Sequence, residues 1–211
     1  MDQEKTMIAK EQNEALLWEN FLQGSEQCFK YLHQKYYNDL YAYALKMSND
    51  EYLAKNAIQE LFVYLWKNRS KLSKVQHIRY YLIFSLRRHI IRLLKKEKKH
   101  VHLLLKNEEE TYPFTFSPED IQITKETVLI NEKCVVEALN KLPSRQKEMV
   151  YLRYFQDLSI EEIAQILSVN YQSVLNALGR ALKNLRKLIL SQKSLEIFLY
   201  ILIPTILLFI F

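Results

Sequence analysis

Helix-breaking residues are scarce in this sequence. Its 211 residues include 2 glycines and 4 prolines, which is far below the usual share of either residue in globular proteins. Turn-rich β architectures need both residue types at their tight turns, so the composition disfavours them. Because 49% of the residues are hydrophobic, the chain can bury sizeable cores. We predict an all-α protein with one large domain or two small ones.

Cysteine and glycine are also too few for several kinds of site. Cys28 and Cys134 lie far apart and form no CxxC pair, so we expect free thiols and not a disulfide framework or a zinc site. His100 and His102 are close together, but two histidines alone make a poor metal site. No glycine-rich phosphate loop is present, and no nucleophile with a base and an orienting partner stands out. We predict no metal, no cofactor and no catalytic residue.

Positive charge is in excess and is concentrated in patches. The formal net charge is +6, and a dense patch runs from Arg87 to Lys99. Such a patch favours a polyanionic partner. On charge alone, a solvated face without any partner is an equal alternative. Charged side chains recur along the first twenty residues, so we expect no signal peptide.

Apolar residues at helical spacing predict three amphipathic helices in the first half of the chain. The helices are expected over about residues 25–47, 53–67 and 75–98, each with apolar side chains in steps of three and four. Three such helices can bury one core together. Residues 106–120, KNEEETYPFTFSPED, contain two prolines and an acidic run without a helical period, which predicts a linker.

Further helices are expected over residues 121–142 and from Pro143 onward. We therefore predict a first domain over residues 14–100, an acidic linker over 101–124, a second domain over 125–192 and a hydrophobic tail over 195–211.

The second domain contains a helix-turn-helix pattern. Ser159 and Glu162 form a capping box for a short helix, residues 168–170 form a short connection, and a longer helix follows. Since the major groove, about 12 Å wide, admits one helix, the exposed N-terminal side chains of the longer helix should read bases while nearby cations hold phosphates. The expected recognition-helix residues are Tyr171, Gln172, Ser173, Asn176, Arg180 and Lys183, and the expected DNA-backbone contacts are Arg145 and Arg153. A helical hairpin that only packs is the alternative.

Two segments together carry a family resemblance that covers most of the chain. Residues 138–186 include LPSRQKE, LRYF and LSIEEIA, and they resemble the fourth conserved region of extracytoplasmic-function (ECF) sigma factors. Residues 57–72, AIQELFVYLWKNRSKL, resemble the second conserved region. The chain thus resembles an ECF member of the sigma-70 family, in a Bacteroidetes-like form. The resemblance implies a non-enzymatic sigma factor that binds core RNA polymerase, recognises promoter DNA and directs transcription initiation.

The resemblance also implies roles for the first domain. Its second helix is implied to dock on a coiled coil of the largest polymerase subunit, with these residues at or beneath the surface: Asn56, Gln59, Glu60, Phe62 and Trp66. Its third helix is implied to capture and melt the minus-ten element through Tyr80, Tyr81, Arg87, Arg88, Arg92, Lys95 and Lys96. Aromatic side chains beside cations favour single strands, although both tyrosines could equally be core residues. The helix-turn-helix is implied to read the minus-thirty-five element, and the linker to thread toward the active cleft.

The end of the chain is an uncharged run, Ile197 to Phe211. As a helix it would span about 22 Å, which is short for a bilayer core of about 30 Å. Two interpretations stay open: a membrane-associating or partner-binding segment, or a hydrophobic helix packed on the second domain. We expect a cytoplasmic, nucleoid-associated protein, tethered to the membrane under the first interpretation. An anti-sigma factor is a further candidate partner.

Two other function classes compete with the sigma factor. A helix-turn-helix transcriptional regulator, with or without a membrane tether, would bind a duplex operator alone, usually as a symmetric dimer. A membrane-tethered interaction protein would recruit partners through its helices. The regulator has no need of the polymerase-docking pattern in the first domain, and the interaction protein leaves the second matching region unexplained.

Overall fold

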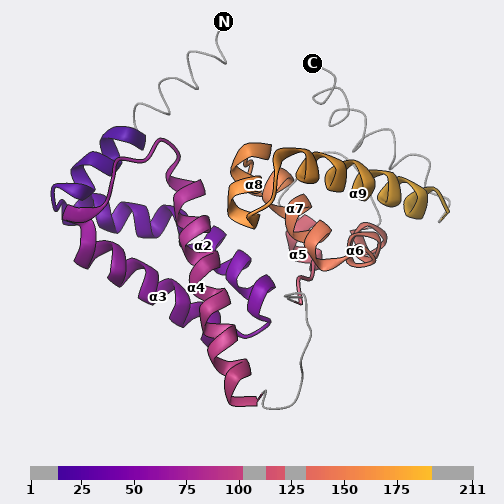
Figure 1. Ribbon diagram of the computed structural model, residues 1–211, viewed down its shortest axis with the longest axis horizontal. Helices are drawn as coiled ribbons and strands as arrows, with labels where there is room; N and C mark the ends of the chain where they lie inside the picture. Colours follow the sequence, from indigo (N-terminus) through magenta and orange to yellow (C-terminus); the bar gives the residue numbers. More distant parts are fainter. Residues whose placement is uncertain (1–13, 102–112, 122–131, 192–211) are drawn as a thin grey trace, which may run out of the picture. The chain divides into compact units, whose positions relative to one another are not determined.

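The structure is a computed structural model that describes residues 14–101, 113–121 and 132–191 (Figure 1). Every secondary-structure element in those ranges is a helix, and the predicted all-α fold class is confirmed. The chain divides into two compact units, Met1–Glu110 and Thr111–Phe211. No helix within the described ranges is long and apolar enough to cross a membrane. The predicted tail lies outside the described residues.

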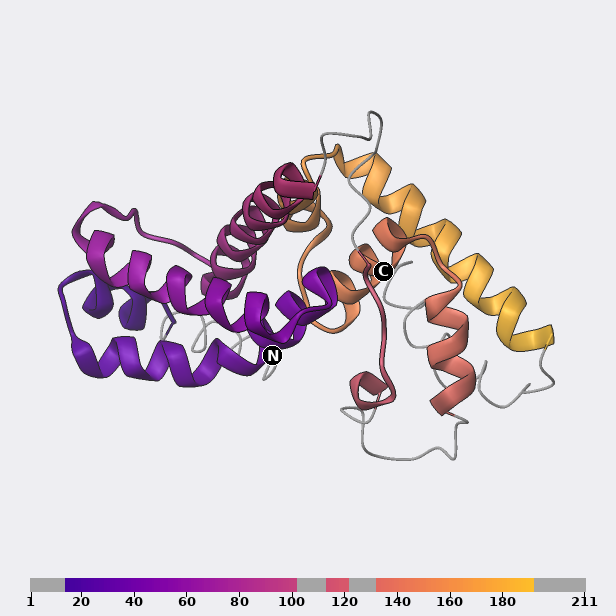
Figure 2. The same cartoon turned by 90° about the horizontal axis from the view of Figure 1, so that it is seen from below.

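The first unit is built on three long helices, α2 (Glu26–Ser48), α3 (Glu51–Asn68) and α4 (Ile78–Val101), each of which packs against the other two (Figures 1 and 2). A 3-10 turn, η1 (Arg69–Lys71), follows α3. The Ser25 hydroxyl caps α2 by accepting from the Cys28 amide at 3.3 Å. The Asp50 carboxylate caps α3 by accepting from the Leu53 amide at 2.9 Å. Capping satisfies amides that have no partner within the helix.

The core of the first unit lies along the apolar stripes predicted from spacing. Each of the three helices turns four or more stripe residues inward, including Leu32, Tyr36, Leu40, Ala57, Ile58, Leu61, Leu82, Leu86 and Ile90. Branched and aromatic side chains from three helices interdigitate there, and burial of each contributes about 1.5–3 kcal/mol. The periodicity therefore placed this core correctly.

A fourth helix, over residues 14–22, closes the first unit and was not predicted. Trp18 is 1% exposed and Phe21 is fully buried. The Trp18 indole packs edge-on against Tyr81, with ring centroids 5.3 Å apart, and its Nε1 donates to the Ser73 carbonyl at 3.0 Å. Gly24 permits the turn into α2 because its φ of 94° lies where other residues are strained.

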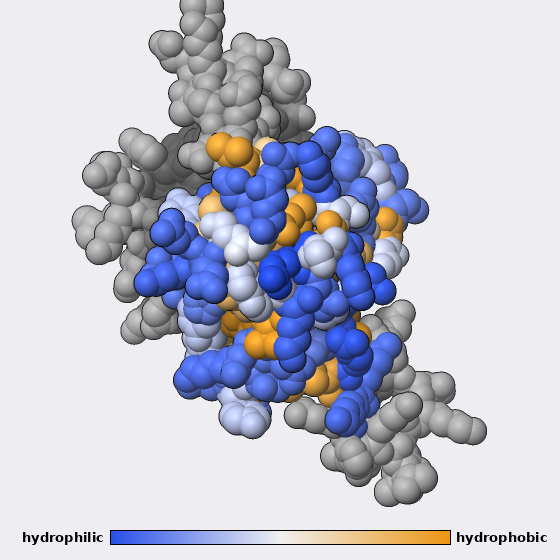
Figure 3. Space-filling view, turned by 90° about the vertical axis from the view of Figure 1, so that its left-hand side faces the viewer, coloured by the Kyte–Doolittle hydropathy of each residue, from blue (hydrophilic) through white to orange (hydrophobic). Residues whose placement is uncertain are grey.

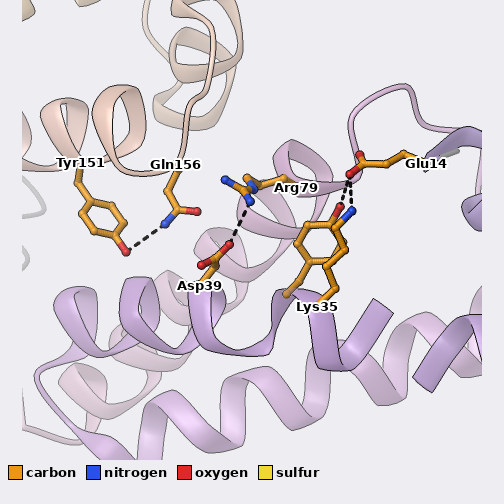
Figure 4. A network of polar contacts seen from close by, with 7 residues as sticks. Glu14, Lys35, Asp39, Arg79, Tyr151 and Gln156 are labelled. Atoms are coloured by element: carbon orange, nitrogen blue, oxygen red, sulfur yellow. Dashed lines mark hydrogen bonds and ion pairs between the residues drawn. The ribbon is translucent and has the colours of Figure 1, made fainter. Parts of the chain in front are cut away.

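Ion pairs and hydrogen bonds fasten the surface of this unit (Figure 4). The Glu14 carboxylate accepts from Lys35 Nζ at 2.6 Å and from the Tyr36 hydroxyl at 2.9 Å. Burial, and then the negative charge of Glu14, raise the pKa of Tyr36. Arg79 at the start of α4 lies 3.2 Å from Asp39 of α2. These contacts join the residue 14–22 helix and α4 to α2.

The second unit contains α5 (Pro118–Ile121), α6 (Glu132–Asn140), α7 (Ser144–Tyr154), α8 (Ile160–Leu167) and α9 (Tyr171–Ser191). The long helix α9 packs against α6, α7 and α8. Its buried residues are spaced three and four apart, as the sequence predicted, and include Val174, Leu178, Ala181 and Leu185. They meet Leu139, Leu152, Ile163 and Leu167 in one core. The opposite side of α9 is left exposed.

Residues 113–121 lie within the predicted linker, and their aromatic side chains pack on the second unit. Phe114 is 1% exposed and Phe116 is 4% exposed, and both rings pack on Tyr151 at centroid distances of 5.5 and 6.2 Å. The Asn140 side chain accepts from the Phe116 amide at 2.8 Å and donates to the Phe116 carbonyl at 2.9 Å. Alternating aromatic residues in an extended chain point to the same side, so this segment belongs to the second domain.

Candidate nucleic-acid interface

The helices α8 and α9 form the predicted helix-turn-helix. At the start of α8 the Ser159 hydroxyl accepts from the Glu162 amide at 3.1 Å, and the Glu162 carboxylate accepts from the Ser159 amide at 2.8 Å. This reciprocal pair is the predicted capping box. Ser168 ends α8 in a left-handed conformation, φ 53°. The Asn170 side chain then caps α9 by accepting from the Ser173 amide at 2.7 Å.

The exposed side of α9 holds the predicted recognition residues. Tyr171 is 45% exposed, Gln172 and Asn176 are exposed, and Ser173 is half-buried. Gln172 Nε2 donates to Asn176 Oδ1 at 3.1 Å across one helical turn. Further along the helix, the cations Arg180 and Lys183 are exposed. The structure therefore places an uncharged polar surface before a basic one on the same helix.

The predicted backbone contacts Arg145 and Arg153 are both engaged within the second unit. Arg145 is exposed, and its Nη2 donates to the Leu167 carbonyl at the end of α8 at 3.4 Å. Arg153 is half-buried, and its Nη1 donates to the Leu158 carbonyl at 3.0 Å. Arg145 thus contacts the C-terminal end of α8, and Arg153 contacts the loop just before its N-terminal end. The Arg145 side chain, on α7 next to the helix-turn-helix, is exposed to solvent, whereas the Arg153 side chain mainly fixes the loop before α8.

In the first unit, α4 presents most of the predicted basic surface. Its exposed cations are Arg88, Arg92, Lys95 and Lys96, and Arg87 is half-buried. The Arg88 guanidinium lies over the Phe84 ring, 5.4 Å from its centroid. The face of the first unit in Figure 3 is mainly hydrophilic, with apolar side chains in small separate areas.

The two tyrosines of α4 differ in their surroundings. Tyr81 packs on the buried Trp18, and burial raises the pKa of its hydroxyl. Tyr80 is half-buried and packs on Phe84 at a centroid distance of 5.9 Å. Tyr81 is itself half-buried, and its ring supports the residue 14–22 helix.

The polar side of α3 is linked to α4 through one glutamate. Glu60 accepts from the Asn56 side chain at 3.0 Å, and its other oxygen lies 2.8 Å from His89 Nε2. The Arg92 guanidinium lies 2.6 Å from His89 Nδ1. Burial lowers the pKa of His89, and Arg92 adds to that effect while the Glu60 carboxylate opposes it. His89 was not singled out from the sequence, because a lone histidine on a helix carries no pattern.

The other predicted docking residues range from exposed to buried. Gln59 is exposed. Phe62 is 4% exposed and packs on Phe29 and His33. Trp66 is half-buried. Its ring centroid lies 4.9 Å from that of Phe29 and 4.3 Å from the Arg69 guanidinium carbon. Phe62 thus lies beneath the α3 surface and supports it from within.

Among the residues that the structure describes, no group of three histidine, cysteine or acidic side chains could hold a metal ion. Cys28 is a free, half-buried thiol.

Comparison with known families identifies both units. Residues 32–100 match Sigma-70 region 2, and residues 132–185 match Sigma-70 region 4. This chain belongs to the sigma-70 family, in its ECF group. It is a sigma factor that acts with core RNA polymerase at promoter DNA to direct transcription initiation, and it is not an enzyme.

Three curated relatives of this sigma factor come from Bacillus subtilis (strain 168). ECF RNA polymerase sigma factor SigM is 26% identical over 159 residues, 74% of this chain and 92% of SigM. RNA polymerase sigma factor YlaC is 27% identical over 156 residues, 74% of this chain and 88% of YlaC. RNA polymerase sigma factor SigV is 50% identical over 50 residues, which are 24% of this chain and 30% of SigV. The Bacteroidetes-like form stays a prediction.

Two solved structures share the fold of the sigma factor. One is CnrH in complex with the cytosolic domain of CnrY, with 17% identity and a TM-score of 0.56 over 85% of this chain and 98% of that chain. The other is RpoE with the anti-sigma factor NepR from Bartonella quintana, with 18% identity and a TM-score of 0.54 over 76% of this chain and 96% of that chain. At this identity the likeness supports the helical architecture.

Proposed function

We propose that the sigma factor divides promoter recognition between its two units. The second unit reads a duplex upstream element through α9, and the first unit binds polymerase and the element where the strands open. The observation that carries this proposal is the helix-turn-helix, with an uncharged exposed start of α9 followed by the exposed cations Arg180 and Lys183. A recognition helix in the major groove uses its N-terminal side chains on base edges and its flanking cations on phosphates.

In the second unit we assign base contacts to the exposed start of α9 and phosphate contacts to cations around it. Tyr171, Gln172, Ser173 and Asn176 face the bases. Arg180 and Lys183 extend along the groove, and Arg145 reaches the backbone from the start of α7. Arg153 acts with them by fixing the loop before α8 through its bond to Leu158. Phosphate contacts set affinity and register without reading sequence.

In the first unit we assign the melting element to α4. Arg87, Arg88, Arg92, Lys95 and Lys96 form a basic stripe that neutralises phosphates of a single strand. Tyr80, packed on Phe84, is the aromatic side chain assigned to an unstacked base. Tyr81 supports it from the core side through Trp18.

Docking on core polymerase is assigned to the polar side of α3. Gln59 and Glu60 are exposed beside the half-buried Asn56, and Phe62 and Trp66 keep the helix in place from beneath. Because Glu60 also contacts His89, the docking surface is joined to α4. This contact between α3 and α4 supports the proposal that polymerase binding and promoter melting use one continuous surface.

Run-off transcription with purified core polymerase tests the proposed function. The sigma factor should yield promoter-specific transcripts from genomic fragments, and the absence of a specific transcript on every fragment would contradict the proposal.

Arg180→Ala should weaken promoter binding for all sequences and reduce the slope of log K against log salt concentration by about 1, because one phosphate contact is lost. Lys141→Ala, which removes an exposed cation between α6 and α7, is the matched control. An unchanged slope would remove Arg180 from the interface.

We further propose a cytoplasmic, nucleoid-associated location, with a membrane tether in the uncharged segment Ile197–Phe211. Such an apolar run is costly to leave in water. Deleting it should move the protein from membrane to soluble fractions while promoter-specific transcription persists. If the full-length protein never sediments with membranes, the tether is wrong.

An anti-sigma factor is also proposed as a partner. CnrH and RpoE, which share this fold, were solved with CnrY and with the anti-sigma factor NepR. Copurification from cells, followed by inhibition of run-off transcription by the captured protein, tests it. A captured protein that leaves transcription unchanged would not be an anti-sigma factor.

A further inference from the structure

The start of α9 contains no charged side chain. Residues 171–179 read YQSVLNALG, and the first cation of the helix is Arg180. In the major groove, guanine is read most often by arginine or lysine, and cytosine by aspartate or glutamate. The polar groups available here are instead amides and hydroxyls, and the amides of Gln172 and Asn176 are exposed. This surface lacks the usual means of reading a G·C pair.

The two amides form one unit. Gln172 Nε2 donates to Asn176 Oδ1 at 3.1 Å, which uses one lone pair of that oxygen. A second lone pair and both Asn176 Nδ2 hydrogens stay available, since an amide oxygen has two lone pairs and an amide nitrogen two donors. Adenine shows an acceptor, N7, beside a donor, the N6 amino group. An asparagine amide matches that pair with its nitrogen on N7 and its oxygen on N6.

Apolar surface lies next to the amides on the same side of α9. Tyr171 is 45% exposed and Leu175 is half-buried. These positions are neighbours on the helix surface, because 171 and 175, like 172 and 176, are four residues apart and 172 and 175 are three apart. Thymine is the base that presents a methyl group in the major groove, so this apolar surface fits the thymine of an adjacent A·T pair. The inward side of the same turns is closed by Val174 and Leu178.

We infer that α9 reads an adenine in the upstream promoter element through Asn176, with Gln172 as the residue that positions its amide. The inference rests on the proposed role of α9 as the recognition helix, and it names the base class that the helix selects. The hydrogen bond from Gln172 restricts the rotation of the Asn176 amide before DNA binds, which lowers the entropy lost on contact. The element is therefore specified at this position as A·T and not as G·C.

Selection from a promoter library tests the inference with the intact holoenzyme. The library is randomised over the upstream element, and bound DNA is sequenced. Wild-type protein should enrich adenine at one position by about five- to 150-fold over guanine, the range for a bidentate contact. Asn176→Ala should bring that preference close to unity, and Asn176→Arg should shift it to guanine. Gln172→Ala should lower it by a smaller factor. Asn184→Ala, an exposed amide two turns further along α9, should leave it unchanged.

A chemical probe gives the same answer without changing the protein. Replacing the selected adenine by 7-deazaadenine removes the N7 acceptor and keeps the Watson–Crick pair, and it should weaken holoenzyme binding several-fold. The Asn176→Ala protein should be insensitive to that replacement. Equal loss in both proteins would mean that another side chain contacts N7, and the inference would be wrong.

The outcomes separate this inference from the proposed function. The adenine assignment fails if the wild-type holoenzyme prefers G·C at the position where Asn176→Ala abolishes the base preference. It also fails if Asn176→Ala keeps the adenine preference. In both cases α9 stays the recognition helix. If no upstream element is enriched and Arg180→Ala binds like wild type, the proposed role of α9 fails, and the adenine assignment fails with it.

Discussion

The two units close their cores in different ways. In the first unit the residue 14–22 helix supplies Trp18 and Phe21, which are almost fully buried, and one hydrogen bond to Ser73 orients the indole. In the second unit an extended segment supplies Phe114 and Phe116, and the two bonds from Asn140 hold it. Both units thus bury two aromatic side chains, and they differ in the bonds on those residues: the Trp18 ring makes one hydrogen bond, whereas the Phe116 backbone makes two with one side chain.

The units also differ in how their proposed functional side chains are used. In the first unit Glu60 contacts His89, and Tyr81 supports Trp18, so the same groups serve the fold and the interface. On α9 the side chain of Gln172 contacts that of Asn176 in the adjacent turn. Substitutions in the first unit should therefore change stability and function together. Substitutions on the exposed side of α9 should separate them.

The largest expected effect tests closure by burial. Trp18→Ala should destabilise the first unit by about 3–5 kcal/mol, because it removes a large buried ring and leaves a cavity. Urea unfolding followed by the fluorescence of Trp66, the other tryptophan of the chain, measures the change. Leu16→Ala, in the same helix but 58% exposed, should stay within about 0.5 kcal/mol of wild type. Similar losses for both variants would show that burial of Trp18 does not close the unit.

Closure by hydrogen bonds is tested by Asn140→Ala. The substitution removes the two hydrogen bonds that the Asn140 side chain makes with the backbone of the buried Phe116, and it should cost about 1–3 kcal/mol. Hydrogen exchange over α6 and α7, which resolves the second unit from the first, measures the loss. Asn184→Ala on exposed α9 is the control. Unchanged protection in Asn140→Ala would mean that the aromatic rings alone hold residues 113–121.

A smaller effect is expected at the start of α8. Ser159→Ala removes one half of the capping box, and it should cost about 1 kcal/mol. Ser159→Asp should keep most of the stability, because aspartate caps as well as serine does. Thermal unfolding followed by circular dichroism compares the two variants. If both lose the same stability, the Ser159 hydroxyl contributes nothing to the start of α8.

Periodicity predicted most of the fold because its signal is local. The stripes of α2, α3 and α4, the capping box at Ser159 and the turn before α9 all follow from spacing within one helix or between two neighbouring helices. The exposed residues of α9 were predicted for the same reason. Residues whose place depends on distant contacts were missed. Trp18 reaches Ser73, and Asn140 reaches Phe116, and nothing near either residue in the sequence indicates its partner.

The exposed side of α9 gives the smallest expected change and the sharpest contrast with the first unit. Gly179 lies within the helix, and a Cβ there would meet no atom of the described residues within 4 Å. Gly179→Ala should therefore stabilise the second unit by about 0.5–1 kcal/mol, because glycine loses more backbone entropy in a helix. Gly24→Ala, at a φ of 94°, should destabilise the first unit, and thermal unfolding compares both variants with wild type. If Gly179→Ala instead loses stability, this side of α9 packs within the chain and serves the fold, as the proposed interface residues of the first unit do.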